Sequence, residues 1–319
     1  MNQQLKIYFA PFQGITTSTF RRIYADHFKG VDKLFTPYYS KIIVGEKLPS
    51  KILASLKNQV ENGIEVVPQI LSNNASEILS FAKNCQQLGF KELNWNLGCP
   101  HPQVADRKKG SGLLPHPKII NEILQKVSAE IGLNFSVKTR LGYYSSAELE
   151  ALIPIFNRHP ISELIIHART GKQMYSGKAD LEIFSHNANQ SKAQLVYNGD
   201  IQTIEDYENF CLRFPEIPRL MLGRGILTDP FLPARMKGIA LPVNPKAHLQ
   251  KFMEELYLAY RKDKNDQLTL LNLLKEYWRY LANLFNEPIK VLRHLKKTKS
   301  FDAYEEAVAI IFKEFELIR

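Results

Sequence analysis

The segment NWNLGCPHPQVADRKKGSGLL, residues 94–114, combines a free thiol with residues that suit a reactive loop. Cys99 stands between Gly98 and Pro100, three residues after Asn96, at the point where an apolar run ends. Burial as a small hydrophobic side chain is the commonest fate of a free cysteine. A thiol on an exposed loop is a poor packing residue and a good proton donor, so we predict that Cys99 is catalytic.

The other cysteines give no sign of metal or disulfide chemistry. Cys85 and Cys211 fall in amphipathic segments, where we expect inert core residues. The odd number of cysteines, their wide spacing and the lack of a CxxC pair argue against disulfides, zinc and iron–sulfur clusters. We therefore expect no metal site and a reducing, cytoplasmic location. The N-terminal sequence does not read as a signal peptide, and no apolar run approaches the ~18 residues of a membrane helix.

Further side chains capable of chemistry follow other apolar runs. Gln69 closes one run, Lys138 alternates with Val137 and Thr139 in another, and His167 ends the next. A lysine inside a protein needs an anionic or electron-rich partner, because an unpaired buried charge is costly. Together Gln69, Lys138 and His167 predict a donor-rich wall for a flat heterocycle with carbonyls and ring nitrogens. Taken alone, His167 fits a hydrogen-bonded interior histidine equally well.

Two glycine-bearing clusters predict a phosphate site. Asn198-Gly199-Asp200 and Gly223-Arg224-Gly225 each follow an apolar run late in the series. Glycines let backbone N–H groups approach an anion, and Arg224 adds charge-assisted hydrogen bonds. Because no Rossmann or Walker pattern competes for this role, a mononucleotide such as FMN is the natural ligand.

The elements that must position these residues form a regular series. Amphipathic helical segments separate most of the β-type runs, and two of them carry capping-box spacing at Ser145 with Glu148 and Thr203 with Asp206. This alternation predicts an α/β protein, a (β/α)8 TIM barrel. An open doubly wound sheet would want a G-x-G-x-x-G turn after the first run, where the sequence reads APFQGITTS. The eight runs are residues 6–12, 33–39, 65–71, 92–98, 134–142, 163–169, 194–200 and 219–225.

A barrel gathers its chemistry at the carboxyl-terminal ends of the strands. A polar or glycine-bearing cluster stands at seven of the predicted ends, which packing alone does not explain. These clusters are Ala10-Pro11-Phe12, Gln69, Asn96 to Cys99, Lys138 with Arg140, His167 with Arg169, Asn198 to Asp200, and Gly223 to Gly225.

The last third of the chain predicts a second unit. The barrel is expected over residues 1–240, and the linker LPVNPKAH leads to a small helical bundle over 247–319. Helical spacing places Lys290, Arg293 and Lys297 on one face, which a solvated surface or a polyphosphate track explains equally well. The net charge of +10 and the pI of about 9.3 favour a polyanionic partner, weakly when taken alone.

With these positions assembled, the chain resembles the tRNA-dihydrouridine synthases. The resemblance covers about Phe9 to Phe231, and the helical tail is similar to the family's tRNA-binding domain in kind and length. Its motifs are APF-x-G-I-T, N-x-G-C-P followed by KKGSGLL, SVKTRLG, IIHART-x4-YSGKAD, YNGDI and MLGRGIL.

The resemblance implies FMN in the barrel, NADPH as reductant, and reduction of a uridine in tRNA to 5,6-dihydrouridine. It implies that Cys99 protonates the uracil and that Asn96 orients it. The residues matched to the family are expected around the flavin ring (Ala10, Pro11, Phe12, Gln69, Lys138, His167) and at its phosphate (Asn198, Gly199, Asp200, Gly223, Arg224). Two more, Arg140 and Tyr175, are expected at the target base. The basic face of Lys290, Arg293 and Lys297 is then expected to bind the tRNA. A tRNA-wrapping enzyme of this kind is expected to be a monomer.

Two departures from the family and two other functions stay open. Phe12 replaces the usual Met, and Ser72 replaces a Gly that is common after the third strand. An FMN barrel acting on a free small molecule, similar to dihydroorotate dehydrogenase, would explain the barrel but neither the helical tail nor the basic charge. A tRNA-binding chaperone with an idle flavin is the other alternative.

Overall fold

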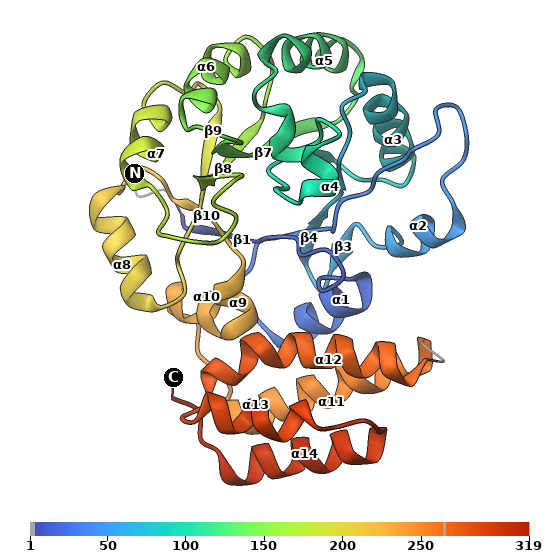
Figure 1. Ribbon diagram of the computed structural model, residues 1–319, viewed down its shortest axis with the longest axis vertical. Helices are drawn as coiled ribbons and strands as arrows, with labels where there is room; N and C mark the ends of the chain where they lie inside the picture. The colour runs from blue at the N-terminus through green and yellow to red at the C-terminus, as the bar shows by residue number, and fades with distance from the viewer. Residues whose placement is uncertain (1–3, 264–265, 319) are drawn as a thin grey trace.

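The computed structural model describes residues 4–263 and 266–318. A ring of parallel strands with helices outside it forms one part of the molecule, and a layer of helices from the C-terminal third lies against it (Figure 1). The parallel strands are β1 (Lys6–Phe9), β2 (Lys33–Phe35), β4 (Ile64–Val67), β5 (Gln69–Ile70), β6 (Glu92–Leu97), β7 (Asn134–Gly142), β8 (Glu163–Thr170), β9 (Gln194–Asn198) and β10 (Arg219–Leu222).

Pro68 explains how the ring closes. It interrupts one extended segment, so that β4 pairs with β2 on one side and β5 pairs with β6 on the other. Proline has no N–H to donate, but its carbonyl still accepts the Asn94 backbone N–H at 2.9 Å. Counted as one strand, β4 and β5 complete a ring of eight parallel strands in the described residues. The predicted barrel is therefore confirmed.

One short strand was not predicted. β3 (Val60–Glu61) pairs antiparallel with β4, and the chain reverses at Asn62 and Gly63. Both turn residues have positive φ, 43° and 82°, which is the geometry that an Asn-Gly hairpin turn requires. The Asn-Gly dipeptide was the available sequence signal for this hairpin.

The interior of the barrel is packed with side chains. Alternate residues of the strands point inward, and an inner cluster includes Tyr8, Phe35, Ile165 and Met221. Ion pairs fill the interior near the amino-terminal ends of the strands. There, Lys33 Nζ donates to Glu92 at 2.6 Å and to Glu163 at 3.0 Å. This end is therefore filled and paired, which leaves the opposite end for a ligand.

Helices surround the barrel much as the amphipathic pattern predicts. The Thr203–Asp206 capping box is present at the start of α8, whereas only half of the predicted box at Ser145 forms. There the helix begins at Ala147, and Glu148 accepts the Ser145 N–H at 3.2 Å, but the Ser145 hydroxyl accepts the Ala147 N–H in place of that of Glu148. The outer helices are α1 (Ser18–His27), α2 (Ser50–Ser55), α3 (Ala75–Gln87), α4 (Pro102–Ala105), η1 (Gly110–Leu113), α5 (Pro117–Glu130), α6 (Ala147–Phe156), α7 (Leu181–Ala188), α8 (Ile204–Arg213), α9 (Arg224–Thr228) and α10 (Leu232–Met236).

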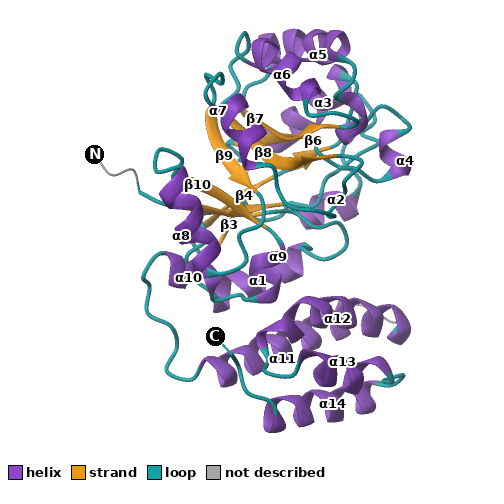
Figure 2. Cartoon of the chain, turned by 60° about the vertical axis from the view of Figure 1, so that its left-hand side comes forward, coloured by secondary structure: helices purple, strands orange, loops and turns teal. Residues whose placement is uncertain are grey.

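The C-terminal helices pack directly on the barrel. A loop leads from α10 into them (Figure 2), and the ring of Tyr277 stacks on Phe20 of α1 at 5.1 Å. Tyr277 also donates to the Ile15 carbonyl at 2.6 Å, and Phe252 meets Phe20 and Phe28 edge to face. These helices are α11 (Pro245–Asp263), α12 (Gln267–Leu281), η2 (Ala282–Leu284), α13 (Pro288–Lys296) and α14 (Phe301–Glu314). The division into units at residues 240 and 247 stays a prediction.

Candidate functional site

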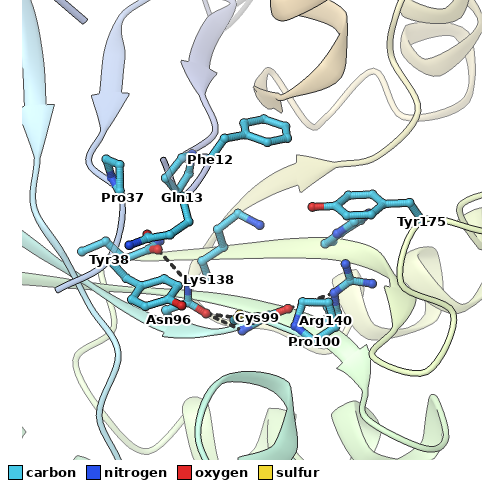
Figure 3. Close-up of a pocket in the computed structure, with 14 residues that line it drawn as sticks. Phe12, Gln13, Pro37, Tyr38, Asn96, Cys99, Pro100, Lys138, Arg140 and Tyr175 are labelled. Atoms are coloured by element: carbon cyan, nitrogen blue, oxygen red, sulfur yellow. Dashed lines mark hydrogen bonds between the residues drawn. The ribbon is translucent and has the colours of Figure 1, made fainter. Parts of the chain in front are cut away.

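A pocket opens at the carboxyl-terminal ends of the strands, where the barrel predicts it (Figure 3). It unites nine residues that the sequence singled out, from five different strand ends. The nine are Pro11, Phe12, Gln69, Asn96, Cys99, Lys138, Arg140, His167 and Tyr175.

The Cys99 loop is held from both sides by hydrogen bonds. The Asn96 side-chain oxygen accepts the backbone N–H groups of Gly98 at 3.0 Å and Cys99 at 2.9 Å. On the other side, the Cys99 carbonyl accepts both the N–H and the hydroxyl of Ser111, each at 3.0 Å. The half-buried thiol is thus presented on a braced turn, rather than packed away in the core like Cys85.

The glycine-broken basic segment after Cys99 now has a structural explanation. Gly110 has φ of 56°, and a Cβ placed there would lie 2.6 Å from the Cys99 carbonyl oxygen. A Cβ on Gly112 would likewise lie 2.2 Å from the Ala105 carbonyl oxygen. Only glycine lets η1 approach the Cys99 turn this closely.

A ladder of amides lines the barrel beneath the thiol. Asn96 donates to Gln69 at 2.6 Å, and Gln69 donates to Asn94 at 2.8 Å. Asn94 in turn donates to Ser136 at 2.8 Å, and the Ser136 hydroxyl donates to Glu92. The chain of bonds fixes which way each amide faces, so the pocket wall has a defined pattern of donors and acceptors.

His167 is buried and Lys138 is half-buried, and burial acts on the charges of both. Burial first and then the nearby Arg140 lower the pKa of Lys138 to about 7. Burial and the surrounding cations also lower the pKa of His167 well below its ordinary value, so His167 is neutral near pH 7. Lys138 Nζ donates to the Asn198 side chain at 2.8 Å, and Asn198 donates to the Met221 carbonyl at 2.8 Å. Lys138 is thus poised to change charge when an anionic or electron-rich ligand arrives.

Arg140 and Tyr175 form the outer wall of the pocket. The Arg140 guanidinium donates to the carbonyls of Gly98 at 2.9 Å and Met174 at 2.7 Å, which ties the Cys99 turn to the loop after β8. Tyr175 lies between two guanidinium groups, 5.6 Å from Arg140 and 5.2 Å from Arg224. Its ring is 51% exposed and therefore available to a planar ligand.

The predicted phosphate residues lie next to the pocket lining and outside it. Asn198 is joined to the pocket through Lys138, and Arg224 through Tyr175. The Asp200 carboxylate accepts hydrogen bonds from Arg169, from Arg224 at 2.9 Å and from the Ala179 N–H at 3.0 Å. Burial opposes its ionisation, but the bond from Arg169 and the other two partners lower the pKa of Asp200 below its usual value. Asp200 is therefore ionised, and its carboxylate fixes the positions of the Arg169 and Arg224 side chains.

Tyr38 is a pocket residue that the sequence did not single out. It lines the pocket beside Cys99 (Figure 3). Burial and the neighbouring sulfur raise the pKa of Tyr38 to about 12, so the phenol stays protonated as a donor. A sequence signal for a tyrosine at this strand end was available, since the second β-type run ends in TPYY. Gln13, Pro37 and Pro100 also line the pocket.

The two departures from the family fall in different places. The Phe12 ring lines the pocket, lies against Gly223 and meets Tyr280 of α12 edge to face at 6.2 Å. Ser72 is buried, and its hydroxyl accepts the Asn74 N–H at 3.0 Å ahead of α3. Phe12 therefore bears on the ligand, whereas Ser72 belongs to a helix start.

Lys290, Arg293 and Lys297 all lie exposed on or just after α13. Lys290 pairs with Glu287 at 2.5 Å, so part of its charge is already balanced. Within residues 4–263 and 266–318, no helix is long and apolar enough to cross a membrane. Over the same residues, no group of three His, Cys, Asp or Glu side chains could hold a metal ion.

Solved structures share the fold. A morphinone reductase aligns with a TM-score of 0.55 at 12% identity, over 76% of this chain and 88% of that one. The histamine dehydrogenase from Rhizobium sp. 4-9 aligns with a TM-score of 0.56 at 14% identity, over 78% of this chain and 49% of that one. Fold and pocket together define an α/β-barrel protein with a ligand site at the carboxyl-terminal mouth.

Sequence relatives give the family. The profile described as Dihydrouridine synthase (Dus) matches residues 8–315. A probable tRNA-dihydrouridine synthase of Staphylococcus aureus (strain N315) is 30% identical over 239 residues, 72% of this chain and 69% of that protein. The probable tRNA-dihydrouridine synthase 2 of Bacillus subtilis (strain 168) is 28% identical over 263 residues, 81% of this chain and 77% of that protein. The chain belongs to the dihydrouridine synthase family.

Proposed function

We propose that this protein is a flavin-dependent enzyme that reduces a specific uridine of tRNA to 5,6-dihydrouridine, with NADPH as reductant. The observation that carries the proposal is the braced Cys99 thiol, which shares one pocket with Lys138 and His167. The family and the names of its relatives support the reaction and the tRNA substrate. We also propose that the enzyme acts as a monomer in the cytoplasm.

The donor set of the pocket fits FMN. The Lys138 amine donates to the neutral side-chain amide of Asn198, so an electron-rich ring would complete its environment. Gln69, Lys138 and His167 would hold the flavin ring, with Ala10, Pro11 and Phe12 beside it. Asn198, Gly199, Gly223 and Arg224 would hold the phosphate. We assign Asp200 a positioning role, since a carboxylate repels an anion but fixes Arg224 beside it.

Cys99 supplies the proton of the reaction. When bound, FMN supplies the hydride for C6 of the uracil, and saturation of the C5–C6 bond then needs one proton at C5. Cys99 donates that proton to C5 and is left as a thiolate. Tyr38, whose phenol lines the pocket beside Cys99, stabilises this thiolate as a positioning residue. Solvent then returns the proton to the thiolate.

The outer wall and the amides orient the base. Arg140 is held over Tyr175, so this pair offers a cation and an aromatic face to a uracil that has left its stack. The Asn96 side chain, buried beside the thiol, fixes the Cys99 turn and borders the space for the base. The pocket thus holds the base edge and the proton donor in one frame.

Loss of Arg224 is expected to weaken the flavin. In Arg224→Ala, the affinity for FMN should fall roughly 10- to 100-fold, because a charge-assisted hydrogen bond to the phosphate is lost. Flavin absorbance per mole of purified protein measures this, and a pale preparation is the expected result. Arg213→Ala is the matched control, since Arg213 is an exposed arginine that pairs with Glu182 away from the pocket. Equal yellow colour in both variants would contradict the phosphate assignment.

The α13 basic face is expected to contribute to tRNA affinity. Changing Lys290, Arg293 and Lys297 to Gln should raise the Michaelis constant for tRNA and lower the salt slope of binding by about two units, since Lys290 is partly neutralised by Glu287. A control variant removes three exposed lysines elsewhere, namely Lys91, Lys118 and Lys126. If both variants bind tRNA alike, net charge alone explains the affinity and the α13 face has no special part.

The proposed reaction is tested with purified protein, FMN, NADPH and tRNA from a strain that lacks the gene. Nuclease digestion and mass spectrometry are expected to find dihydrouridine at defined positions. Free uracil and orotate are tested in parallel. Turnover of either at a rate matching that of tRNA would favour the small-molecule alternative. Biological function retained without dihydrouridine formation would favour the chaperone.

A further inference from the structure

Two loops at the pocket mouth carry an aromatic and cationic cluster with no role in the reaction described above. Tyr143 and Tyr144 follow β7, and Lys172 follows β8. We propose that Tyr144 and Lys172 form a stacking platform for an unpaired nucleobase of the tRNA that flanks the target uridine. The inference rests on the proposed function, because it takes tRNA as the substrate.

The cluster has the composition of a base-stacking site. The Tyr144 ring is 67% exposed and meets the buried Tyr143 ring edge to face, with centroids 4.6 Å apart. Lys172 Nζ lies 5.0 Å from the Tyr143 centroid and 5.5 Å from that of Tyr144. One ring therefore anchors the pair in the protein, and the other offers its surface to solvent beside a cation.

The backbone under the platform is fixed. The Glu148 carboxylate accepts the N–H groups of Tyr143 at 2.7 Å, Tyr144 at 3.0 Å and Ser145 at 3.2 Å. Lys172 N–H donates to the Tyr143 carbonyl at 3.0 Å, which joins the two loops. An exposed aromatic ring on a braced turn loses little conformational freedom when a ligand stacks on it, which favours affinity.

The platform is continuous with the pocket wall. Arg140 comes from the same strand as Tyr143 and donates to the Thr170 carbonyl at 2.8 Å and the Met174 carbonyl at 2.7 Å. Lys172 lies between these two anchored residues, and Tyr175, which lines the pocket, follows them directly. A nucleotide chain that delivers its base past Tyr175 therefore leaves the pocket beside Lys172.

The chemistry of the platform selects its occupant. An exposed ring with an adjacent amine suits a planar, electron-rich group on an anionic backbone, which describes a nucleotide. Base pairs hide their faces in the stack, so only an unpaired base presents a free face to Tyr144. An unpaired neighbour is also expected in a loop from which the target base is flipped.

The test compares Tyr144→Ala, Tyr144→Phe and Lys172→Gln for binding of tRNA from a strain that lacks the gene. Stacking on an aromatic side chain is worth about 1–3 kcal/mol per base, so Tyr144→Ala should weaken binding roughly 5- to 150-fold. Tyr144→Phe keeps the ring and should bind within about twofold of wild type. Lys172→Gln should lower the salt slope by about 0.7, whereas Tyr144→Ala should leave it unchanged. Leu212→Ala, at an 83% exposed apolar residue on α8, is the control.

Wild-type affinity in Tyr144→Ala would overturn the platform, as would equal losses in Tyr144→Phe and Tyr144→Ala. Dihydrouridine formation by the wild type separates this outcome from failure of the proposed function. If the wild type modifies tRNA while Tyr144→Ala binds normally, the platform alone is wrong. If the wild type makes no dihydrouridine, the proposed function is wrong, whatever Tyr144 does.

Discussion

Replacing Cys99 with alanine is expected to lower dihydrouridine formation by about 10²- to 10⁴-fold, the range that a positioned general acid contributes. The turn that carries the residue is held through backbone atoms by Asn96 and Ser111, so the substitution should leave the pocket shape intact. Flavin content and tRNA affinity should therefore match those of the wild type. Single-turnover reduction of tRNA measures the chemical step without interference from product release.

Two further variants make the Cys99 result specific. Cys211→Ala removes a free thiol from α8, outside the pocket lining, and should keep full activity. Tyr38→Phe removes the phenol beside Cys99 but keeps the ring, so the chemical step should slow while flavin content stays that of the wild type. Activity in Cys99→Ala close to that of Cys211→Ala would show that another group delivers the proton.

Replacing Lys138 with methionine is expected to lower the affinity for reduced FMN by roughly 10- to 100-fold, because a buried charge-assisted hydrogen bond is lost. The pH dependence of the affinity for reduced FMN is the sharper readout. With the site empty, burial first and then Arg140 lower the pKa of Lys138 to about 7, and an electron-rich ring favours the charged amine. Binding of reduced FMN is therefore strongest below pH 7.

Above pH 7 the empty site holds a neutral amine that must take up a proton when the flavin binds. The affinity of the wild type should consequently fall by up to about tenfold per pH unit above 7. Anaerobic titrations between pH 6 and 9 measure this slope. Lys138→Met should lose it, while Lys91→Met, at an exposed lysine before β6, should keep it. An identical slope in wild type and Lys138→Met would assign the proton to another group.

The barrel was predictable because its strands are short buried runs punctuated by helices with readable starts. Strand ends were also predictable, which is why nine of the candidate residues meet in one pocket. Parallel strands place their carboxyl ends on one face, so residues more than 160 positions apart, such as Phe12 and Tyr175, become neighbours of one cavity. That step needs topology and no knowledge of individual contacts.

What the sequence did not reveal depends on side-chain direction. The second run was predicted to reach residue 39, but β2 ends at Phe35, so strand alternation does not decide which tyrosine faces the pocket. Tyr38 lines the pocket, whereas Tyr39 packs against Phe81 and bonds Ser55. The same limit applies to Asp200, whose place in a phosphate motif hid its bonds to Arg169 and Arg224.

Competing partners explain the remaining difference. Ser145 and Glu148 have the spacing of a capping box, but the Glu148 carboxylate accepts the N–H groups of Tyr143 and Tyr144 besides that of Ser145, and the Ser145 hydroxyl accepts the Ala147 N–H. Several free backbone donors compete for the same carboxylate, and spacing alone does not say which of them it takes. The outcome is a rigid turn under Tyr144, which spacing alone would have missed.

Deuterium labelling tests most directly whether the Cys99 thiol protonates a tRNA uridine reduced by the flavin. The holoenzyme is run in D₂O with unlabelled NADPH and tRNA from a strain that lacks the gene, and the dihydrouridine is isolated for NMR. We predict one deuterium at C5, because the thiol exchanges with solvent, and product formation by Cys99→Ala that is about 10²- to 10⁴-fold slower than in the wild type. Deuterium at C6 instead of C5, or labelled product from Cys99→Ala at the wild-type rate, would contradict this prediction.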